Sequence, residues 1–432
     1  MTEEATGDRR SVLVADAHTK GRLPGIVAAT SRDGVVDWRC VFGDTGAAYR
    51  IASITKTFTA VAVMQLRDEG RIDLDEAIGR HVPETPYADQ AIRRLLSHSS
   101  GMTAEPAGPW WERVPGGSWS ELVAANRRAT HVFKPGERYH YSNLGYGLLG
   151  ELVARLRGRS WWDVVTERIV EPVGLTGTTF ARPDDAAVGT SRNPLTDELV
   201  REPSEDEGAM AAAGQLWSTP DDLLRWVDVL AAGHPGVLSA DTAVEMRTVQ
   251  SGDPDLQHRG AYGLGLRLRW SDQATLIGHS GSLPGFLAGM FADPVSRVGA
   301  VVLTDATYGL DPEGVCASLI ESAPPAQAQP PVADPASPAT DLAGAWYWGN
   351  VPFELVPTAS GAIVISGANR SRIEQVGVDV YRGLNGYWAG ELLHVHRDAD
   401  GRARHLDVVT FILTRTPYDP KAPIPGRTPE PL

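Results

Sequence analysis

Residues 53–69 read SITKTFTAVAVMQLRDE, and this stretch carries the strongest helical pattern in the chain. Its apolar side chains recur at the spacing of one helix face, at Phe58, Val61, Val63, Met64 and Leu66. Gly70 follows and is expected to end the helix. The stretch opens with Ser53 and Lys56, which stand one helical turn apart and therefore point to the same side. The hydroxyl and the amine can meet there, beside the positive end of the helix.

This pairing of Ser53 with Lys56 has a chemical use. A serine hydroxyl becomes a nucleophile when a neighbouring base takes its proton. A lysine can be that base when burial or a nearby cation lowers the pKa of its amine. Only four of the 40 basic residues are lysines, and arginine cannot be deprotonated in this way. For an isolated S-x-x-K pattern, the alternative is a capping serine beside a solvated lysine.

A second candidate is the tripeptide Tyr141-Ser142-Asn143, which precedes an apolar period over residues 144–156. That period predicts another helix, closed by Gly158. Asn143 could cap this helix, and Tyr141 could be a half-buried loop aromatic. For this tripeptide alone, these structural roles are the favoured interpretation.

A third candidate is His279-Ser280-Gly281-Ser282, between a strand pattern over residues 274–278 and a turn over residues 283–285. A histidine that ends a strand can present its ring to a cleft, and Gly281 would let another backbone approach closely. The alternative is a polar turn.

The strand patterns around these motifs predict the fold class. Two apolar runs, over residues 25–32 and 35–42, flank Asp33-Gly34, which is a typical hairpin turn. Further strand patterns return at residues 262–270, 274–278, 286–291 and 298–304, with helical patterns in between. We therefore expect an α/β (α+β) domain over residues 1–321, in which one sheet joins early and late strands.

A second domain follows a linker. Residues 322–340 read SAPPAQAQPPVADPASPAT, and such a Pro- and Ala-rich stretch is typical of a semi-extended domain boundary. After it, residues 341–432 show strand patterns at 362–366, 392–396 and 406–413, divided by turn residues. This predicts a small antiparallel β-barrel-like domain, with an open sheet as the alternative.

Composition limits the function classes. The 432 residues carry a formal net charge of −14, with no run of lysine and arginine. Nucleic acids and anionic membranes attract basic surfaces, so neither is expected as a partner. No secretory leader pattern and no run of about 18 apolar residues occurs, so we expect a cytoplasmic protein. Two cysteines, Cys40 and Cys316, cannot form a disulfide framework.

We expect no metal and no cofactor. His394 and His396 share one strand face, and His405 follows nearby in the sequence. A fourth ligand is not evident, so solvated or core histidines are favoured. His98 and His140 are expected to be structural.

Taken together, the order S-x-x-K, Y-x-N, H-x-G resembles the SxxK serine hydrolases related to class C β-lactamases, D,D-peptidases and family VIII esterases. Supporting stretches are Tyr49–Ser53, Leu95–Gly101, Pro135-Gly136 and Ala213–Pro220. The resemblance covers roughly residues 11–320. It implies a β-lactamase/penicillin-binding-protein-like sheet flanked by helices, with an all-helical subdomain. The domain after the linker is similar to the lipocalin-like appendage of some family members.

The resemblance also implies catalytic roles. Ser53 would be the nucleophile that forms an acyl-enzyme. Lys56 would hold its hydroxyl and share the proton. Tyr141 would act as the general base toward Ser53 and later as an acid toward the leaving group. The backbone N–H groups of Ser53 and Ser282 would form an oxyanion hole.

It further implies the substrate-binding residues Asn143, His279, Ser280, Gly281 and Ser282. Asn143 would orient the Lys56 amine or the acyl amide. His279 stands where β-lactamases carry the lysine of Lys-Thr-Gly. A histidine is neutral or titrates near neutrality, whereas a fixed cation favours a substrate carboxylate. This departure favours esters, amides or thioesters over penicillins.

The expected function is a serine acyl hydrolase that acts on ester or amide substrates, D-amino-acid peptides included. One alternative is an acyltransferase or peptide-cyclising thioesterase with an amine or alcohol acceptor. The other is a non-catalytic peptide- or ligand-binding sensor. The expected partner is a small-molecule or peptide acyl substrate, which could be a carrier-bound acyl donor.

Overall fold

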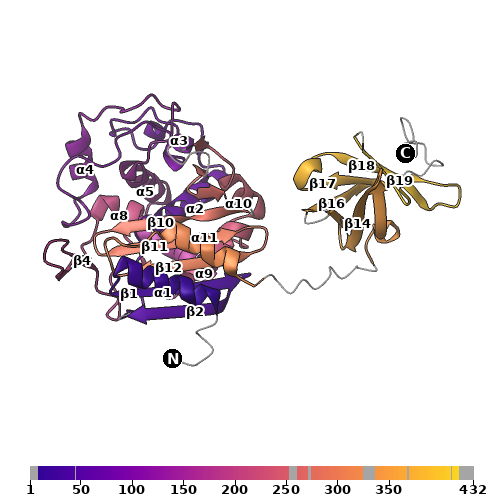
Figure 1. Cartoon of the computed structure of the whole chain (residues 1–432). Coiled ribbons are helices and arrows are strands. Elements are labelled where there is room, and N and C mark those ends of the chain that lie inside the picture. Colours follow the sequence, from indigo (N-terminus) through magenta and orange to yellow (C-terminus); the bar gives the residue numbers. More distant parts are fainter. Residues whose placement is uncertain are drawn as a thin grey trace. The chain divides into compact units, whose positions relative to one another are not determined.

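The computed structural model describes residues 8–43, 45–252, 260–270, 274–324, 336–366, 369–409 and 411–417. The chain divides into two compact units, Met1–Ala323 and Pro324–Leu432 (Figure 1). Most of the predicted 322–340 linker, residues 325–335, lies outside the described residues.

Eight strands form one antiparallel sheet in the first unit, in the order β2-β1-β12-β11-β10-β9-β8-β7. They are β1 (Gly25–Arg32), β2 (Val35–Gly43), β7 (Ser251–Gly252), β8 (Gly260–Tyr262), β9 (Arg267–Trp270), β10 (Thr275–Leu283), β11 (Phe286–Asp293) and β12 (Val298–Thr304). Strands from the two ends of the unit meet where β1 pairs with β12, with Ala29 opposite Val301. The predicted sheet of early and late strands and the predicted β1–β2 hairpin are both confirmed.

Two predicted strands differ from those in the structure. The pattern over residues 262–270 forms two strands, β8 and β9, because Gly265 takes a positive φ of 81° and turns the chain between them. The strand predicted to stop at Gly278 continues as β10 through Leu283. His279 to Ser282 therefore lie within a strand, and the alternative of a polar turn is excluded.

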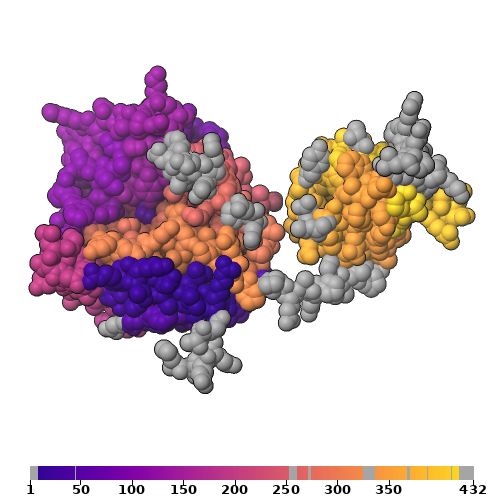
Figure 2. Space-filling view, in the orientation of Figure 1, coloured from indigo at the N-terminus to yellow at the C-terminus, as the bar shows by residue number. Residues whose placement is uncertain are grey.

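Helices cover both faces of this sheet (Figure 1). On one face, α1 (Arg9–Gly21) and α11 (Pro312–Ser322) pack together over side chains such as Ala28 and Val302. On the other face, α9 (Pro220–Ala232) packs over the alternate residues, such as Ala29 and Val301. Figure 2 shows the first of these faces, where the indigo N-terminal segment and the orange late segment lie side by side.

Helices make up most of the regular secondary structure between β2 and β7, where the resemblance implied an all-helical subdomain. Its helices are α2 (Thr55–Asp68), α3 (Ile92–Leu96), α4 (Trp119–Asn126), α5 (Asn143–Arg157), α6 (Trp161–Val165), α7 (Glu171–Val173), α8 (Ala211–Gly214), α9 and α10 (Ala240–Met246). Its two small sheets pair β3 (Tyr49–Arg50) with β6 (Trp217–Ser218) and β4 (Thr190–Arg192) with β5 (Leu199–Arg201). Within the described residues, no helix has the length and apolar character that a membrane crossing needs.

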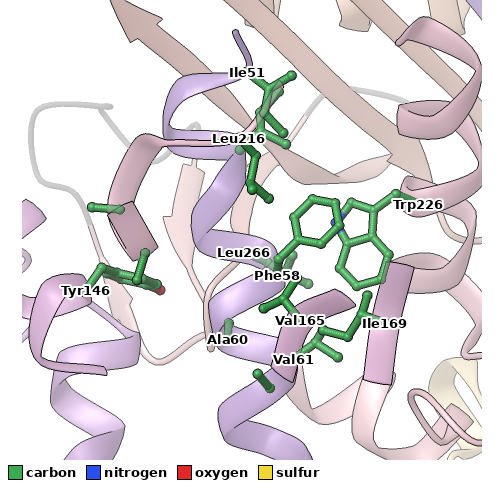
Figure 3. Close-up of a cluster of buried hydrophobic side chains, with 14 of the residues drawn as sticks. Ile51, Phe58, Ala60, Val61, Tyr146, Val165, Ile169, Leu216, Trp226 and Leu266 are labelled. Carbon is green, nitrogen blue, oxygen red and sulfur yellow. The ribbon is translucent and has the colours of Figure 1, made fainter. Parts of the chain in front are cut away.

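Helix α2 lies inside the unit, because every residue from Thr55 to Leu66 is buried. Phe58 stacks on Trp226 of α9 with 4.3 Å between the ring centroids (Figure 3). The Trp226 indole Nε1 donates a hydrogen bond to Thr57 Oγ1 at 2.7 Å. Val165 and Ile169 pack beside this ring pair (Figure 3). The helix that carries Lys56 is therefore fixed by packing on all sides.

The second unit is a closed barrel of eight strands. They are β13 (Gly344–Trp348), β14 (Val351–Thr358), β15 (Gly361–Ser366), β16 (Asn369–Gly377), β17 (Val380–Gly383), β18 (Leu392–Arg397), β19 (Ala403–Val408) and β20 (Phe411–Thr414). Pairing of β13 with β20 closes it, which confirms the predicted barrel and excludes the open sheet. The strand predicted over residues 406–413 is two strands, because Val409 takes a φ of 59° between them.

Candidate active site

Ser53 lies in a 3-10 turn, Ala52–Ile54, directly before α2 and not within that helix as the pattern predicted. Ala52 has a φ of 50°, which is unusual for a residue with a side chain. Strand β10 packs against this turn: a Cβ added to Gly281 would lie 2.2 Å from the Ile51 carbonyl oxygen. Glycine is therefore required at position 281, and its close approach helps to hold the strained turn in place.

Lys56 is completely buried one turn later. Its Nζ lies 2.9 Å from Ser53 Oγ and donates a hydrogen bond to the Ala213 carbonyl oxygen of α8 at 2.7 Å. Burial lowers the pKa of Lys56 to about 7, against the opposing attraction of nearby carboxyl groups. A substantial share of the amine is therefore neutral at pH 7 and can accept a proton.

Tyr141 completes a triangle with these two residues. Its hydroxyl hydrogen-bonds to the Ser53 side chain, and Lys56 Nζ lies 5.1 Å from its ring centroid. Burial raises the pKa of Tyr141 well above 10, so the phenol keeps its proton at neutral pH. The structure therefore brings together the three residues that the resemblance implied to be catalytic.

The Tyr141 ring is held by His98, whose ring centroid lies 4.1 Å away. His98 is buried, and its Nδ1 accepts a hydrogen bond from the Ser142 backbone N–H at 3.1 Å. Burial lowers the pKa of His98 well below its usual value, so the ring is neutral. Sequence reasoning treated His98 as structural; its place in the matched stretch Leu95–Gly101 was the available sign of a role beside Tyr141.

Asn143 is the first residue of α5, and Ser142 is the cap instead: its Oγ accepts a hydrogen bond from the Gly145 N–H at 3.1 Å. The Asn143 amide donates to Glu105 Oε1 at 2.7 Å, and Glu105 Oε2 accepts from Trp111 Nε1 at 2.8 Å. Asn143 thus faces a carboxylate that the sequence did not single out. The backbone oxygen of Ala213, not Asn143, accepts from the Lys56 amine.

His279 is buried on β10, with 6.3 Å between its ring centroid and that of Tyr141. Its Nε2 lies 2.8 Å from the Tyr262 hydroxyl, and its Nδ1 lies 2.5 Å from the Ser280 carbonyl oxygen. Burial and the Lys56 charge lower the pKa of His279 to about 3. The ring is therefore neutral, with Nδ1–H as donor and Nε2 as acceptor. Of the two sequence-based expectations, a neutral ring or one that titrates near neutrality, this burial favours the neutral ring.

The other residues of this motif alternate across the sheet. Gly281 faces the Ser53 turn, whereas Ser280 points the opposite way and donates to Glu313 Oε1 of α11 at 2.8 Å. Glu313 also forms an ion pair with Arg267 at 2.7 Å. Ser282 is exposed.

Acidic groups dominate the electrostatic surroundings of Lys56. Glu207, Glu105 and Glu112 each raise its pKa through their charges. Glu207 is buried in an ion pair with Arg50 at 2.8 Å. Burial also raises the pKa of Glu112. Burial raises the pKa of Glu207 as well, to about 8, so burial opposes the negative charge of both carboxyl groups.

Two histidines of the barrel lie side by side. His396 and His405 stack with 4.3 Å between their ring centroids. Across the described part of the chain, no group of three His, Cys, Asp or Glu residues could hold a metal ion. Cys40 and Cys316 are both free thiols.

Comparison with known protein families covers both units. The family model described as "Beta-lactamase" matches residues 11–323, and a domain of unknown function (DUF7586) matches residues 335–415. Protein flp of Staphylococcus aureus (strain NCTC 8325 / PS 47) is 26% identical over 320 residues, which is 66% of this chain and 60% of that protein. The chain thus spans about 60% of the length of the curated relatives that it matches.

Two solved structures share the fold. A D-stereospecific amidohydrolase from Streptomyces sp. is 27% identical with a TM-score of 0.62, covering 75% of this chain and 98% of that one. The octameric penicillin-binding protein homologue from Pyrococcus abyssi is 21% identical with a TM-score of 0.64, covering 94% and 99%. At that identity, the second likeness concerns the fold alone.

Proposed function

Because the chain belongs to the β-lactamase family, a fold family of serine hydrolases, we propose that it is an acyl hydrolase that forms an acyl-enzyme on Ser53. The observation that carries this proposal is the buried Lys56 amine, 2.9 Å from Ser53 Oγ and with a pKa near 7. A lysine kept for packing or solubility has no need of either property.

The first step is acylation. Ser53 Oγ attacks the substrate carbonyl carbon, and its proton passes to the neutral Lys56 amine. The oxygen of the tetrahedral intermediate is received by the backbone N–H groups of Ser53 and Ser282, a contribution of about 3–4 kcal/mol in comparable sites. The bond to the leaving nitrogen or oxygen then breaks. Tyr141 gives that atom a proton and is reprotonated from Lys56.

This assignment makes Lys56 the base, whereas the family resemblance implied Tyr141. The reason is the order of the two pKa values. Burial lowers the pKa of Lys56 to about 7 and raises the pKa of Tyr141 well above 10. A resting phenolate would be costly beside a resting neutral amine. Tyr141 therefore serves as the donor to the leaving group.

Water completes the cycle by the reverse path. It attacks the acyl carbon, its proton passes to Lys56, and Ser53 Oγ leaves with a proton to regenerate the free enzyme. The same acyl-enzyme could pass to an amine or alcohol, which is the acyltransferase and peptide-cyclising thioesterase alternative. Adding a D-amino acid amine to compete with water would measure how the acyl-enzyme divides between hydrolysis and acyl transfer.

The charges of the site favour amino-acid amides or peptides over penicillins as substrates. His279 is neutral, so it offers no fixed cation to a substrate carboxylate. Glu105 instead acts on Lys56 as a negative charge and would favour a substrate ammonium group. The likeness to a D-stereospecific amidohydrolase at 27% identity supports the D-amino-acid series.

The experiment is intact-mass analysis of the full chain after mixing with D-phenylalanine p-nitrophenyl ester, its L-enantiomer, or benzylpenicillin. We expect an adduct of the D-phenylalanyl mass, absent in Ser53→Ala and retained in the surface control Ser120→Ala. An adduct that persists in Ser53→Ala would contradict the proposal. The absence of any adduct and of any turnover would favour the non-catalytic sensor.

A further inference from the structure

Strand β10 lies between the Ser53 turn on one face and helix α11 on the other. Gly281 faces the turn, whereas the Ser280 hydroxyl on the opposite face donates a hydrogen bond to Glu313 Oε1 at 2.8 Å. The Ser280 side chain thus points away from the reacting serine, although the resemblance implied that it binds substrate. We propose that Glu313 is a positioning residue, which acts through Ser280 to hold the backbone of β10 where the Ser282 N–H meets the oxyanion. This inference rests on the proposed acyl hydrolase function.

This part of β10 has no partner strand on one of its edges. Within the described residues, β9 pairs with β10 only from Thr275 to Gly278, and Gly278 lies opposite Arg267. From His279 to Leu283 the ladder continues with β11 alone. The motif that begins at His279 therefore starts where the support from β9 ends. Because a misplacement of about 1 Å can lower a rate about a hundredfold, the backbone here needs another fixed contact.

The Glu313 carboxylate links the two strands just beyond the end of their ladder. Its Oε1 accepts the hydrogen bond from Ser280 and also lies 2.7 Å from Arg267 Nε of β9. The Glu313 and Arg267 side chains are only 15% and 20% exposed. Hydrogen bonds to a charged group are stronger than neutral ones, and partial burial limits their screening by salt. One carboxylate oxygen therefore ties β10 to β9 at the first position that the ladder leaves free.

Helix α11 gives Glu313 a fixed base. Gly289 of β11 lies opposite Ser280, and a Cβ added to Gly289 would lie 2.6 Å from the Pro312 carbonyl oxygen. The first turn of α11 thus sits directly on β11, beside β10. Further along the helix, Cys316 is fully buried against the sheet, and Figure 1 shows α11 lying over these strands. Glu313 therefore extends from a firmly packed helix and can anchor the strand.

A purely structural ion pair would behave differently from a positioning residue. The oxyanion contact forms in the transition state and not in the bound substrate, so a misplaced donor lowers kcat and leaves KM nearly unchanged. A structural contact lowers the free energy of unfolding instead, and the molecules that stay folded turn over at the wild-type rate. Separate values of kcat and KM therefore distinguish the two roles.

Steady-state kinetics of the full chain with D-phenylalanine p-nitrophenyl ester test the proposal. Ser280→Ala and Glu313→Ala should each lower kcat about ten- to a hundredfold and leave KM within about twofold. The double variant should be no slower than either single variant, because both changes break the same contact. Ser280→Thr keeps the hydroxyl and should restore most of kcat. Glu321→Ala removes an exposed acid from the same helix and is the matched control, with wild-type kinetics.

Thermal unfolding of each variant shows whether the measured rate belongs to folded protein. If Glu313→Ala does not fold, Ser280→Ala decides, because it leaves the ion pair with Arg267 intact. Wild-type kcat in Ser280→Ala, a raised KM with unchanged kcat, or losses that multiply in the double variant would each overturn the proposal. A wild-type chain that forms no Ser53 adduct by intact mass would overturn the proposed function as well. An adduct in the wild type together with unaffected variants would overturn this inference alone.

Discussion

Two neighbouring sites at the start of one buried helix use burial for opposite purposes. At Phe58 and Trp226, burial joins two apolar rings 4.3 Å apart and stabilises the fold. At Lys56, two residues before Phe58 and beside Ser53, burial removes an amine from water and lowers its pKa to about 7. The same lack of solvent that stabilises the first pair makes the second pair reactive. The difference teaches that apolar packing next to Lys56 offsets the free-energy cost of burying its amine.

The largest effect is expected when Lys56 becomes apolar. Lys56→Met keeps the length of the side chain but removes the base, so kcat/KM should fall by about three to five orders of magnitude. Folding should not suffer, because methionine has no charge to bury. Lys20→Met on the exposed end of α1 is the matched control, with wild-type activity. Lys56→Met with wild-type kcat/KM would exclude Lys56 as the base.

The pH dependence of the free energy of unfolding gives a second measurement on the Lys56→Met variant. The folded-state pKa of Lys56 lies near 7 and that of an unfolded lysine near 10.4. Between these values the unfolded state binds more protons, so this group makes the free energy of unfolding rise with pH. The wild type should therefore gain stability relative to Lys56→Met from pH 7 to 9 in urea titrations. An unchanged difference would place the Lys56 pKa at its ordinary value.

Phe58 should show the opposite behaviour, because its loss should lower stability and not activity. Phe58→Ala removes a ring from a fully packed site and should lower the free energy of unfolding by about 3–5 kcal/mol. Its activity per folded molecule should stay within a few-fold of wild type at low temperature. Leu195→Ala is the control, since Leu195 is 93% exposed. If Phe58→Ala lost activity without losing stability, the packing role of Phe58 would not be separable from the catalytic role of Lys56.

A smaller effect is expected at His279. His279→Lys would restore a cation where the wild type holds a neutral ring, and should shift preference toward carboxylate-bearing substrates by about tenfold. His279→Gln keeps a hydrogen-bonding group without charge and should leave the preference unchanged. Equal preferences in all three proteins, each with wild-type thermal unfolding, would return His279 to a structural role.

The smallest effect is expected at Glu105. This carboxylate stabilises the Lys56 ammonium, so Glu105→Gln should lower the apparent pKa of the activity profile by roughly half a unit or less. Glu171→Gln, an exposed acid far along the sequence, is the control. A rise in the apparent pKa would mean that Glu105 acts on Lys56 through something other than its charge.

Local features of this site could be predicted from the sequence, and long-range ones could not. The i, i+3 spacing alone brings Lys56 to within 2.9 Å of Ser53. Tyr141 reaches them only through the fold, so the residues alone left it open and the family resemblance supplied it. The Asn143 contact with Glu105 depends on a loop without periodic pattern.

The same distinction between local and long-range features explains why some sequence-based predictions failed. The burial of His279, which lowers its pKa to about 3, results from the fold around it, including the contact with Tyr262, and the Lys56 charge lowers the pKa further. No local sequence pattern records these long-range neighbours. The barrel strands were visible in part, but closure depends on the pairing of β13 with β20 across the whole unit. Strand breaks at Gly265 and Val409 were missed because neither position interrupts the apolar pattern.

The central claim is that a neutral Lys56 activates Ser53, and the pH dependence of single-turnover acylation tests it most directly. The rate of Ser53 acylation by an uncharged activated ester would be followed by rapid mixing from pH 5 to 9. We expect the rate to rise with pH through one apparent pKa near 7, with no second inflection from His279. A rate that is flat across this range, or that rises only toward the ordinary lysine value above pH 9, would contradict the account.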